Sequence, residues 1–307
     1  MRESEVIIVD GIPAVEYDQL INECVKYSII SLPFTVDRMS IPNEKQRALN
    51  IAKGKVAESL FKFFCNQNRI EPDFEACTTP FWTVDKRDFL LDGSEWDIKN
   101  NFIYCPEDVL SNQSYSDLPA LVPNRFPGDQ WSKREQIQIV GSRDIFFLFT
   151  FLKNADLTSG TRGSEFLEIV LSDRQQGFIR DLYNKYRGQP QNNQPFTEQW
   201  FWDQMSDLGP LAFYRLNFRP HLIITCYANA THWTLFKDTG PYDRNNNFQT
   251  YLEPRWYQKF GTGSINFMNG TLWTKITNAT VPVSLLPSFL SMHPSLRDHI
   301  RCGRLKL

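Results

Sequence analysis

Residues 85–99 read DKRDFLLDGSEWDIK and predict a two-stranded hairpin. Asp92-Gly93 stands between two strand-like runs, and this dipeptide favours a type I′ turn. With these two residues as the loop, the opposed positions are Leu91–Ser94, Leu90–Glu95, Phe89–Trp96 and Asp88–Asp97. Opposed side chains in such a ladder have Cβ atoms roughly 4.5–5.5 Å apart.

Strand alternation gives this hairpin one apolar and one charged face. The apolar face, suited to burial, carries Phe89, Leu91, Trp96 and Ile98. The other face carries Asp88, Leu90, Glu95, Asp97 and Lys99. Like charges opposite one another are destabilising, and a bound cation would offset the cost of placing Asp88 against Asp97. The charged face therefore predicts a metal site.

The composition is that of a well-packed globular protein. The chain has 307 residues, of which 41% are hydrophobic and 14% aromatic, enough for one large domain or two ordinary ones. The net charge of −2 gives no global basic signature for nucleic acid. Because binding needs only a local basic groove, this argues weakly against a nucleic-acid partner.

The six cysteines are scattered, without a CxxC pair, and predict neither a structural zinc site nor a disulfide framework. Reduced, buried thiols are expected instead. The apolar run near the N-terminus is too short for a signal peptide, and there is no run of about 18 apolar residues. We therefore expect a cytoplasmic protein without a membrane span.

The coarse order of elements predicts a mixed α/β layer. Asn43 is a candidate N-cap for a helix that runs to about Cys65, with a core stripe at Leu49, Ala52, Val56, Leu60 and Phe63. Residues 75–84 are expected to form a strand, interrupted by Pro80. Residues 144–152 form a continuous apolar run, typical of a central strand buried on both faces.

Further elements are expected on both sides of a polar segment at residues 187–195. They are helices over 130–136, 175–186 and 198–205, and strands over 166–171, 221–227 and 266–276, the last with a turn at Asn269-Gly270. We expect one domain with an N-terminal extension over 1–188, and a C-terminal region of mixed α+β type over 196–307.

The acidic residue Asp88, the turn and the following Asp97-Ile98-Lys99 resemble the signature of the PD-(D/E)XK nuclease superfamily, which includes many restriction endonucleases. Asp97-Ile98-Lys99 is the only [DE]xK triplet in the chain, although Arg87 replaces the proline of the superfamily's name. The helix containing Glu58 is similar to the one that supplies an additional metal-binding Glu in many members. The resemblance covers residues 43–152 and implies a restriction-endonuclease-like αβββαβ core, a mixed sheet flanked by helices. It implies that residues 1–188 form the catalytic domain and that residues 196–307 serve recognition or dimerisation.

The resemblance implies a Mg²⁺-dependent endonuclease of restriction or defence type that acts on DNA and leaves 5′-phosphate and 3′-hydroxyl ends. Asp88, Asp97, the Ile98 carbonyl and Glu58 would hold Mg²⁺, with Mn²⁺ as a substitute. Lys99 would position the attacking water or stabilise the charge that develops on the phosphate. Double-strand cutting with one site per chain usually requires two copies, so a homodimer is expected.

Other readings of these residues remain open. Glu58 is as well explained as a solvated helix residue, and Glu95, nearer the turn, is expected to be solvated. The basic residues Lys133, Arg134, Arg143, Arg174, Arg180, Lys185 and Arg187 are more simply surface charges, and Trp131, Trp200, Trp202 and Trp233 more simply packing residues. One rival function is a catalytically silent nuclease-fold protein that binds nucleic acid or assists assembly. Another is a hydrolase of a different substrate with Asp88 and Asp97 as an acid/base pair, which EDTA would not inhibit.

Overall fold

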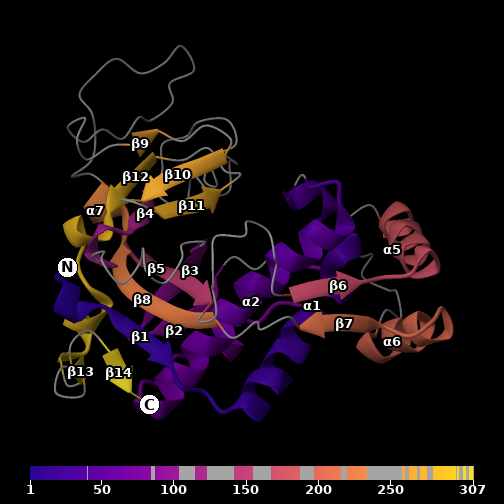
Figure 1. Cartoon of the computed structure of the whole chain (residues 1–307), viewed down its shortest axis with the longest axis horizontal. Helices are drawn as coiled ribbons and strands as arrows, with labels where there is room; N and C mark the ends of the chain where they lie inside the picture. Colours follow the sequence, from indigo (N-terminus) through magenta and orange to yellow (C-terminus); the bar gives the residue numbers. More distant parts are fainter. Residues whose placement is uncertain are drawn as a thin grey trace.

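The structure is a computed structural model, and it has a mixed α/β fold (Figure 1). The residues that it describes are 1–39, 41–83, 87–103, 115–122, 142–154, 167–186, 197–215, 220–233, 258–259, 263–267, 270–274, 279–294, 296, 300–301 and 304–306.

The helices, in chain order, are α1 (Ala14–Met39), α2 (Glu44–Gln67), α5 (Asp173–Tyr186), α6 (Glu198–Asp207) and the short α7 (Ala230–Trp233). Short 3-10 helices include η2 (Glu75–Cys77), η3 (Tyr115–Asp117) and η6 (Phe289–Met292). The strands are β1 (Ile7–Asp10), β2 (Phe89–Leu91), β3 (Ser94–Ile103), β4 (Pro119–Val122), β5 (Ile145–Asn154), β6 (Leu167–Val170), β7 (Ala212–Arg215), β8 (Pro220–Ala228), β9 (Gln258–Lys259), β10 (Gly263–Phe267), β11 (Gly270–Thr274), β12 (Ala279–Pro282), β13 (Ile300–Arg301) and β14 (Arg304–Lys306).

The main sheet is mixed, which confirms the predicted α/β class. Its described strands follow the order β10-β11-β3-β5-β8-β1-β14-β13, and β2 pairs with β3. β3 and β5 run parallel, whereas β8 is antiparallel to both of its neighbours, β5 and β1. α1 and α2 lie together beside this sheet, and β6, β7, α5 and α6 lie at the end away from the marked termini (Figure 1).

The predicted hairpin is confirmed. Asp92 and Gly93 have φ values of 51° and 75°, and positive φ at both central positions defines a type I′ turn. The ladder has the predicted pairs Leu91–Ser94, Leu90–Glu95 and Phe89–Trp96. Phe89 and Trp96 are fully buried, so the apolar face points into the core as expected.

The helix predicted from Asn43 is also confirmed as α2. The Asn43 side chain accepts a hydrogen bond from the backbone N–H of Gln46, as its capping position requires. The stripe at Leu49, Ala52, Val56 and Leu60 is buried, and Phe63 is partly buried against the same core. This face of α2 packs against the side of the sheet that carries Phe89 and Trp96.

β5 is the central strand that the apolar run predicts. Leu148 and Leu152 belong to the core beneath α2, while Phe147, Phe149 and Phe151 belong to a second core on the opposite face. That second core is closed by residues of β4 and β12, including Ala120, Leu121 and Val281. Both faces of β5 are therefore buried.

The strand expected over residues 75–84 is wrong for its described part. Glu75–Cys77 form the 3-10 helix η2, and Phe81 and Trp82 lie in a turn. The Phe81 ring lies 6.0 Å from that of Phe34 and 4.6 Å from that of Trp82. These aromatic residues serve packing against α1 rather than a sheet.

No element was predicted for residues 14–39, where the serines Ser28 and Ser31 and the helix breaker Pro33 occur. All three lie inside the helix α1. The Ser28 hydroxyl donates to the Val25 carbonyl at 2.7 Å, and the Ser31 hydroxyl donates to carbonyls of the preceding turn. Because these hydroxyls are satisfied within the helix, it can bury serines among its apolar residues.

The strands and helices expected further along the chain are confirmed as β6, α5, α6 and β8. The hairpin expected over 266–276 is confirmed as the antiparallel pair β10 and β11, although Gly270 lies in β11, opposite Phe267, rather than in the turn. The predicted helix at 130–136 and the polar segment at 187–195 lie outside the described residues.

Strands from the two predicted regions pair with one another. β6 pairs with β7, and β8 lies between β5 and β1 in the main sheet. The division into 1–188 and 196–307 stays a prediction, but the main sheet includes strands from both parts. In the described ranges, no helix has the length and hydropathy needed to cross a membrane.

The turn of the hairpin can be tested by Gly93→Ala. A Cβ meets no atom within 4 Å there, so the cost comes from the backbone, whose φ of +75° suits glycine. We expect a loss of about 1–2 kcal/mol in the free energy of unfolding, measured by urea denaturation. Gly177→Ala in α5 is the matched control, because its added Cβ also meets open space; it should gain about 0.5–1 kcal/mol. Equal effects of the two changes would contradict the turn assignment.

Candidate active site

Asp97 and Lys99 share the face of β3 that points away from α2. Lys99 Nζ lies 2.7 Å from Asp97 Oδ2, and each side chain is 15% exposed. Lys99 Nζ also lies 5.7 Å from the centre of the Phe147 ring on the neighbouring strand. The two residues thus share a face, as predicted, and also form a direct, partly buried ion pair.

Asp88 lies beside this pair but outside the regular ladder. The ladder stops at Phe89–Trp96, one pair short of the predicted Asp88–Asp97 pair. The backbone N–H of Asp88 donates to the Trp96 carbonyl at 2.8 Å, and Asp88 Oδ2 accepts the Ile98 N–H at 2.5 Å. Asp88 is therefore held against β3 by its carboxylate as well as by its backbone.

The Ile98 carbonyl faces the same edge of β3 as Asp88. The N–H and C=O of one strand residue point toward the same neighbouring strand, and the Ile98 N–H points to Asp88. Among the described strands, only β2 and β11 pair with this edge, at Ser94–Trp96 and at Ile103. The position of the carbonyl is compatible with its predicted role as a ligand.

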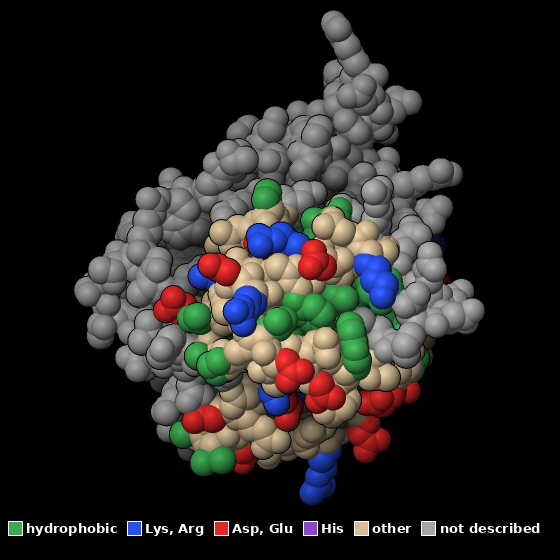
Figure 2. Space-filling view, turned by 90° about the vertical axis from the view of Figure 1, so that its right-hand side faces the viewer, with side chains coloured by type: hydrophobic (Ala, Val, Ile, Leu, Met, Phe, Trp, Pro, Cys, Tyr) green, Lys and Arg blue, Asp and Glu red, His purple; other side chains and the backbone are tan. Residues whose placement is uncertain are grey.

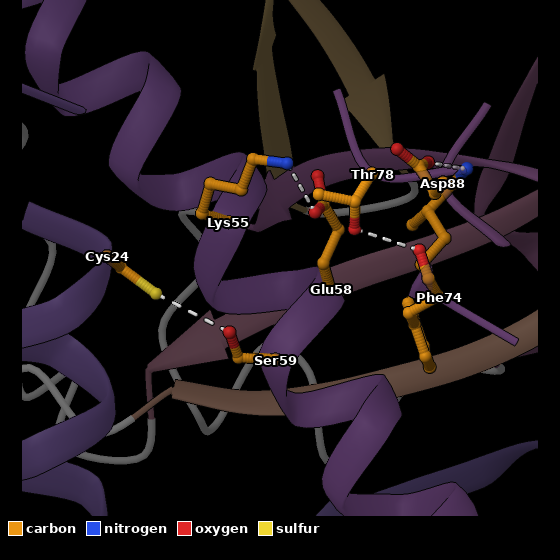
Figure 3. A network of polar contacts seen from close by, with 8 residues as sticks. Cys24, Lys55, Glu58, Ser59, Phe74, Thr78 and Asp88 are labelled. Carbon is orange, nitrogen blue, oxygen red and sulfur yellow. Dashed lines mark hydrogen bonds and ion pairs between the residues drawn. The ribbon is translucent and has the colours of Figure 1, made fainter. Parts of the chain in front are cut away.

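Glu58 comes from α2 and is brought toward Asp88. Figure 3 shows Lys55 and Glu58 on one helix, with Thr78 and Asp88 on neighbouring segments. Lys55 Nζ lies 2.6 Å from Glu58 Oε2, and the two side chains are 22% and 23% exposed. Glu58 is thus neither fully solvated nor unpaired, and Lys55 is a neighbour that the sequence prediction did not assign to the site. The spacing of three residues on a helix was the available signal for this ion pair.

The charges around Asp88 act strongly on its carboxyl group. Burial raises the pKa of Asp88 well above its ordinary value, and the nearby Glu58 and Asp97 carboxylates raise it further. The Ile98 N–H and the Lys55 ammonium act in the opposite direction but do not cancel the effect. The ionised form of Asp88 is therefore costly in the metal-free protein, and a cation would relieve that cost.

The donor chemistry suits a hard cation, but the carboxylates are not assembled as a closed cage. In the described part of the chain, no three His, Cys, Asp or Glu side chains are grouped closely enough to hold a metal ion. Mg²⁺ usually binds one or two carboxylates and keeps several waters. The residues present fit such an open site, formed by Asp88 and Asp97 with the Ile98 carbonyl.

Glu95 has a separate partner. Its Oε2 lies 2.7 Å from Arg87 Nε, and its side chain is 49% exposed. This agrees with its expected solvated position. Arg87, which replaces the proline of the superfamily's name, thus forms an ion pair across the hairpin.

The described cysteines offer no activated nucleophile. All four are free; Cys24, Cys65 and Cys226 are buried as expected, whereas Cys77 is partly exposed. Cys24 lies near the site, with its sulfur 3.6 Å from Ser59 Oγ (Figure 3). Burial raises the pKa of the Cys24 thiol to about 12, so it remains protonated at neutral pH.

The weaker sequence candidates are surface or packing residues where they are described. Trp200 and Trp202 are partly buried, and the aromatic rings of Phe178 and Phe201 lie 5.9 Å and 5.2 Å from them, respectively. Side-chain positions for Lys133, Arg134, Arg187, Trp131 and Trp233 lie outside the described residues.

The side of the molecule toward α5 and α6 has no continuous basic surface in its described part. Arg174, Arg180 and Lys185 are exposed on α5, but Asp173 and Asp181 are exposed on the same helix. Figure 2 shows acidic and basic side chains interspersed around apolar ones on this face. These basic residues are best explained as ordinary surface charges.

Comparison with models of protein families, with curated proteins and with solved structures finds no match for this chain. The site therefore rests on its own geometry and on the resemblance of its residues to the nuclease signature.

The raised pKa of Asp88 makes a prediction about stability. Because the folded protein holds this proton more tightly than the unfolded chain does, the stability is complete below the ordinary pKa and is lost as the pH rises through the folded-state pKa. Asp88→Asn stays neutral and can still accept the Ile98 hydrogen bond. In EDTA at pH 7.5 or above we expect its melting temperature to exceed that of wild type by roughly 2–4 °C.

The difference should disappear as the pH is lowered toward 4, where Asp88 is protonated in wild type. Asp181→Asn, an exposed site on α5, is the control and should shift the melting temperature by less than about 1 °C. A lower melting temperature for Asp88→Asn at neutral pH would contradict the electrostatic assignment.

Proposed function

We propose that this chain is a metal-dependent endonuclease that hydrolyses phosphodiester bonds of DNA, of restriction or defence type. The observation that carries the proposal is the position of Asp88. Its carboxylate is bonded to the Ile98 N–H, next to the Asp97–Lys99 ion pair and under the influence of Glu58. This is the local arrangement implied by the resemblance to the PD-(D/E)XK nucleases. We also propose that the chain has the complete αβββαβ core of that superfamily.

Each residue has a distinct task in this proposal. Asp88 and Asp97 hold the cation, with the Ile98 carbonyl at the same strand edge and Glu58 as an additional carboxylate. Bound Mg²⁺, or Mn²⁺ in its place, would polarise the phosphate and lower the pKa of a coordinated water. Lys99 lies one strand position beyond Ile98 and can place its ammonium near a phosphate oxygen, where negative charge develops.

The product and the assembly follow from the same proposal. The cleaved DNA would carry 5′-phosphate and 3′-hydroxyl ends, as the resemblance implies. A homodimer would place two such sites on the two strands of a duplex.

A second candidate function is nucleic-acid binding or assembly without turnover. The observation in its favour is that the described residues contain no preassembled group of three acidic, His or Cys side chains. In this alternative the ion pairs Lys99–Asp97 and Lys55–Glu58 neutralise the carboxylates permanently. Cleavage of DNA would exclude it.

Incubation of the chain with long duplex DNA and Mg²⁺ tests the leading function. We expect cleavage that EDTA abolishes, and rates at least about 100-fold lower for Asp97→Asn and for Lys99→Met, because each removes a charge that acts on the reacting phosphate. Gel mapping of the products measures the rates, and discrete bands would indicate sequence-specific cutting.

Glu95→Gln is the matched control, since Glu95 is on the same strand and face but pairs with Arg87. Its rate should stay within about threefold of wild type, as expected for an exposed ion pair. Cleavage that is equal in wild type, Asp97→Asn and Lys99→Met would exclude the site.

A further inference from the structure

Lys55 is held on α2 by two kinds of contact. Its ammonium lies 2.6 Å from Glu58 Oε2 and 4.8 Å from the centre of the Tyr27 ring of α1. Both partners of the ion pair are less than one quarter exposed. Salt screens a pair in such a position less than it screens a fully exposed one. The pair is therefore more than a transient surface contact between neighbouring turns of the helix.

The ion pairs also balance the charge of the carboxylates. Glu58 is bonded to Lys55 and Asp97 to Lys99, while Asp88 is influenced by Glu58, Asp97 and Lys55. A cation that approached Asp88 from the side of α2 would meet Glu58 already bonded to an ammonium group. A cation bound to Glu58 would also lie close to the Lys55 ammonium, so the two positive charges would repel each other while sharing one carboxylate.

We propose that Lys55 competes with a divalent cation for Glu58, and that Lys55 is thereby a positioning residue that sets the metal affinity of the site. This inference rests on the proposed metal-dependent function and adds a residue that the sequence motif does not contain. Lys55 keeps Glu58 bonded to itself in the metal-free protein. When a cation is bound, Glu58 either leaves Lys55 or shares its negative charge between the ammonium and the cation, and both states weaken binding relative to a Glu58 without the neighbouring ammonium.

Titration of the full chain with Mn²⁺ at low ionic strength, followed by calorimetry, tests this competition. Lys55→Gln should bind Mn²⁺ about 3–10-fold more tightly than wild type, because a positive charge and a competitor for Glu58 are both removed. Glu58→Gln should bind more weakly than wild type. In the Glu58→Gln background, Lys55→Gln should change the affinity by less than about twofold, since the shared carboxylate is gone.

Lys62→Gln is the matched control, because Lys62 is on the same helix and also lies over an aromatic ring, that of Phe74 at 5.3 Å. It should leave the Mn²⁺ affinity within about twofold of wild type. Lys55→Arg keeps the charge and should bind like wild type, and it serves as the comparison if Lys55→Gln does not fold. If Lys55→Gln does not fold, tighter Mn²⁺ binding by Lys55→Arg than by wild type would overturn the inference.

Two results would overturn the inference while leaving the proposed function intact. In the first, wild type binds Mn²⁺ and Asp97→Asn does not, but Lys55→Gln binds Mn²⁺ with the same affinity as wild type. The other is an equal gain from Lys55→Gln with and without Glu58, which would indicate only a long-range charge effect. Failure of wild type to bind Mn²⁺ at all would overturn both the inference and the metal-dependent function.

Discussion

A stack of aromatic rings beneath the hairpin is the interaction on which the rest of the structure depends. Phe89 stacks on Trp96 with ring centres 5.8 Å apart, and Trp96 stacks on Phe146 at 4.8 Å, so three adjacent strands are joined. Two residues far apart in the sequence add to the stack: Phe61 of α2 contacts Phe89, and Phe289 of η6 contacts Trp96. Because these rings fix the inward side chains of β2 and β3, they also fix where the alternating charged positions lie. The candidate site thus lies on the face of the β2–β3 hairpin opposite its tightly packed aromatic face.

The parts of the fold that could be predicted are those that local sequence determines. The Asp92-Gly93 turn needs positive φ at both positions, and the Asn43 cap needs only the N–H of Gln46 three residues later. The helix α1 was not predicted. Its serines are satisfied by its own carbonyls, and residues 28–35 are all buried, so this half lacks the one-sided apolar pattern of a surface helix. The apolar residues Phe81 and Trp82 led to the wrong prediction of a strand. They are partly buried because they pack against the core near α1, and they belong to no sheet.

The candidate site shows the same division between local and tertiary determinants. The register correctly predicted that Asp97 and Lys99 share a face, because that follows from strand alternation alone. It could not predict that Asp88 leaves the ladder and binds the Ile98 N–H, since this depends on the bend before β2. Nor could it show that α2 turns Lys55 and Glu58 toward Asp88, which requires the packing of a helix on a sheet. Spacing along the sequence does not determine which charged residues of other helices and strands lie near a given side chain.

The position of β8 has a consequence for the order in which the chain folds. β5 is synthesised more than 60 residues before β8, yet β8 supplies one of the two strands that flank it in the sheet. Phe149 and Phe151 can gain their complete surroundings only after the ribosome has released residues 220–228. Pairing at such long sequence separation is slow to form and leaves an apolar edge exposed in the meantime. A nascent chain that ends before β8 therefore leaves this edge of β5 without its antiparallel partner, even though its hairpin can form early.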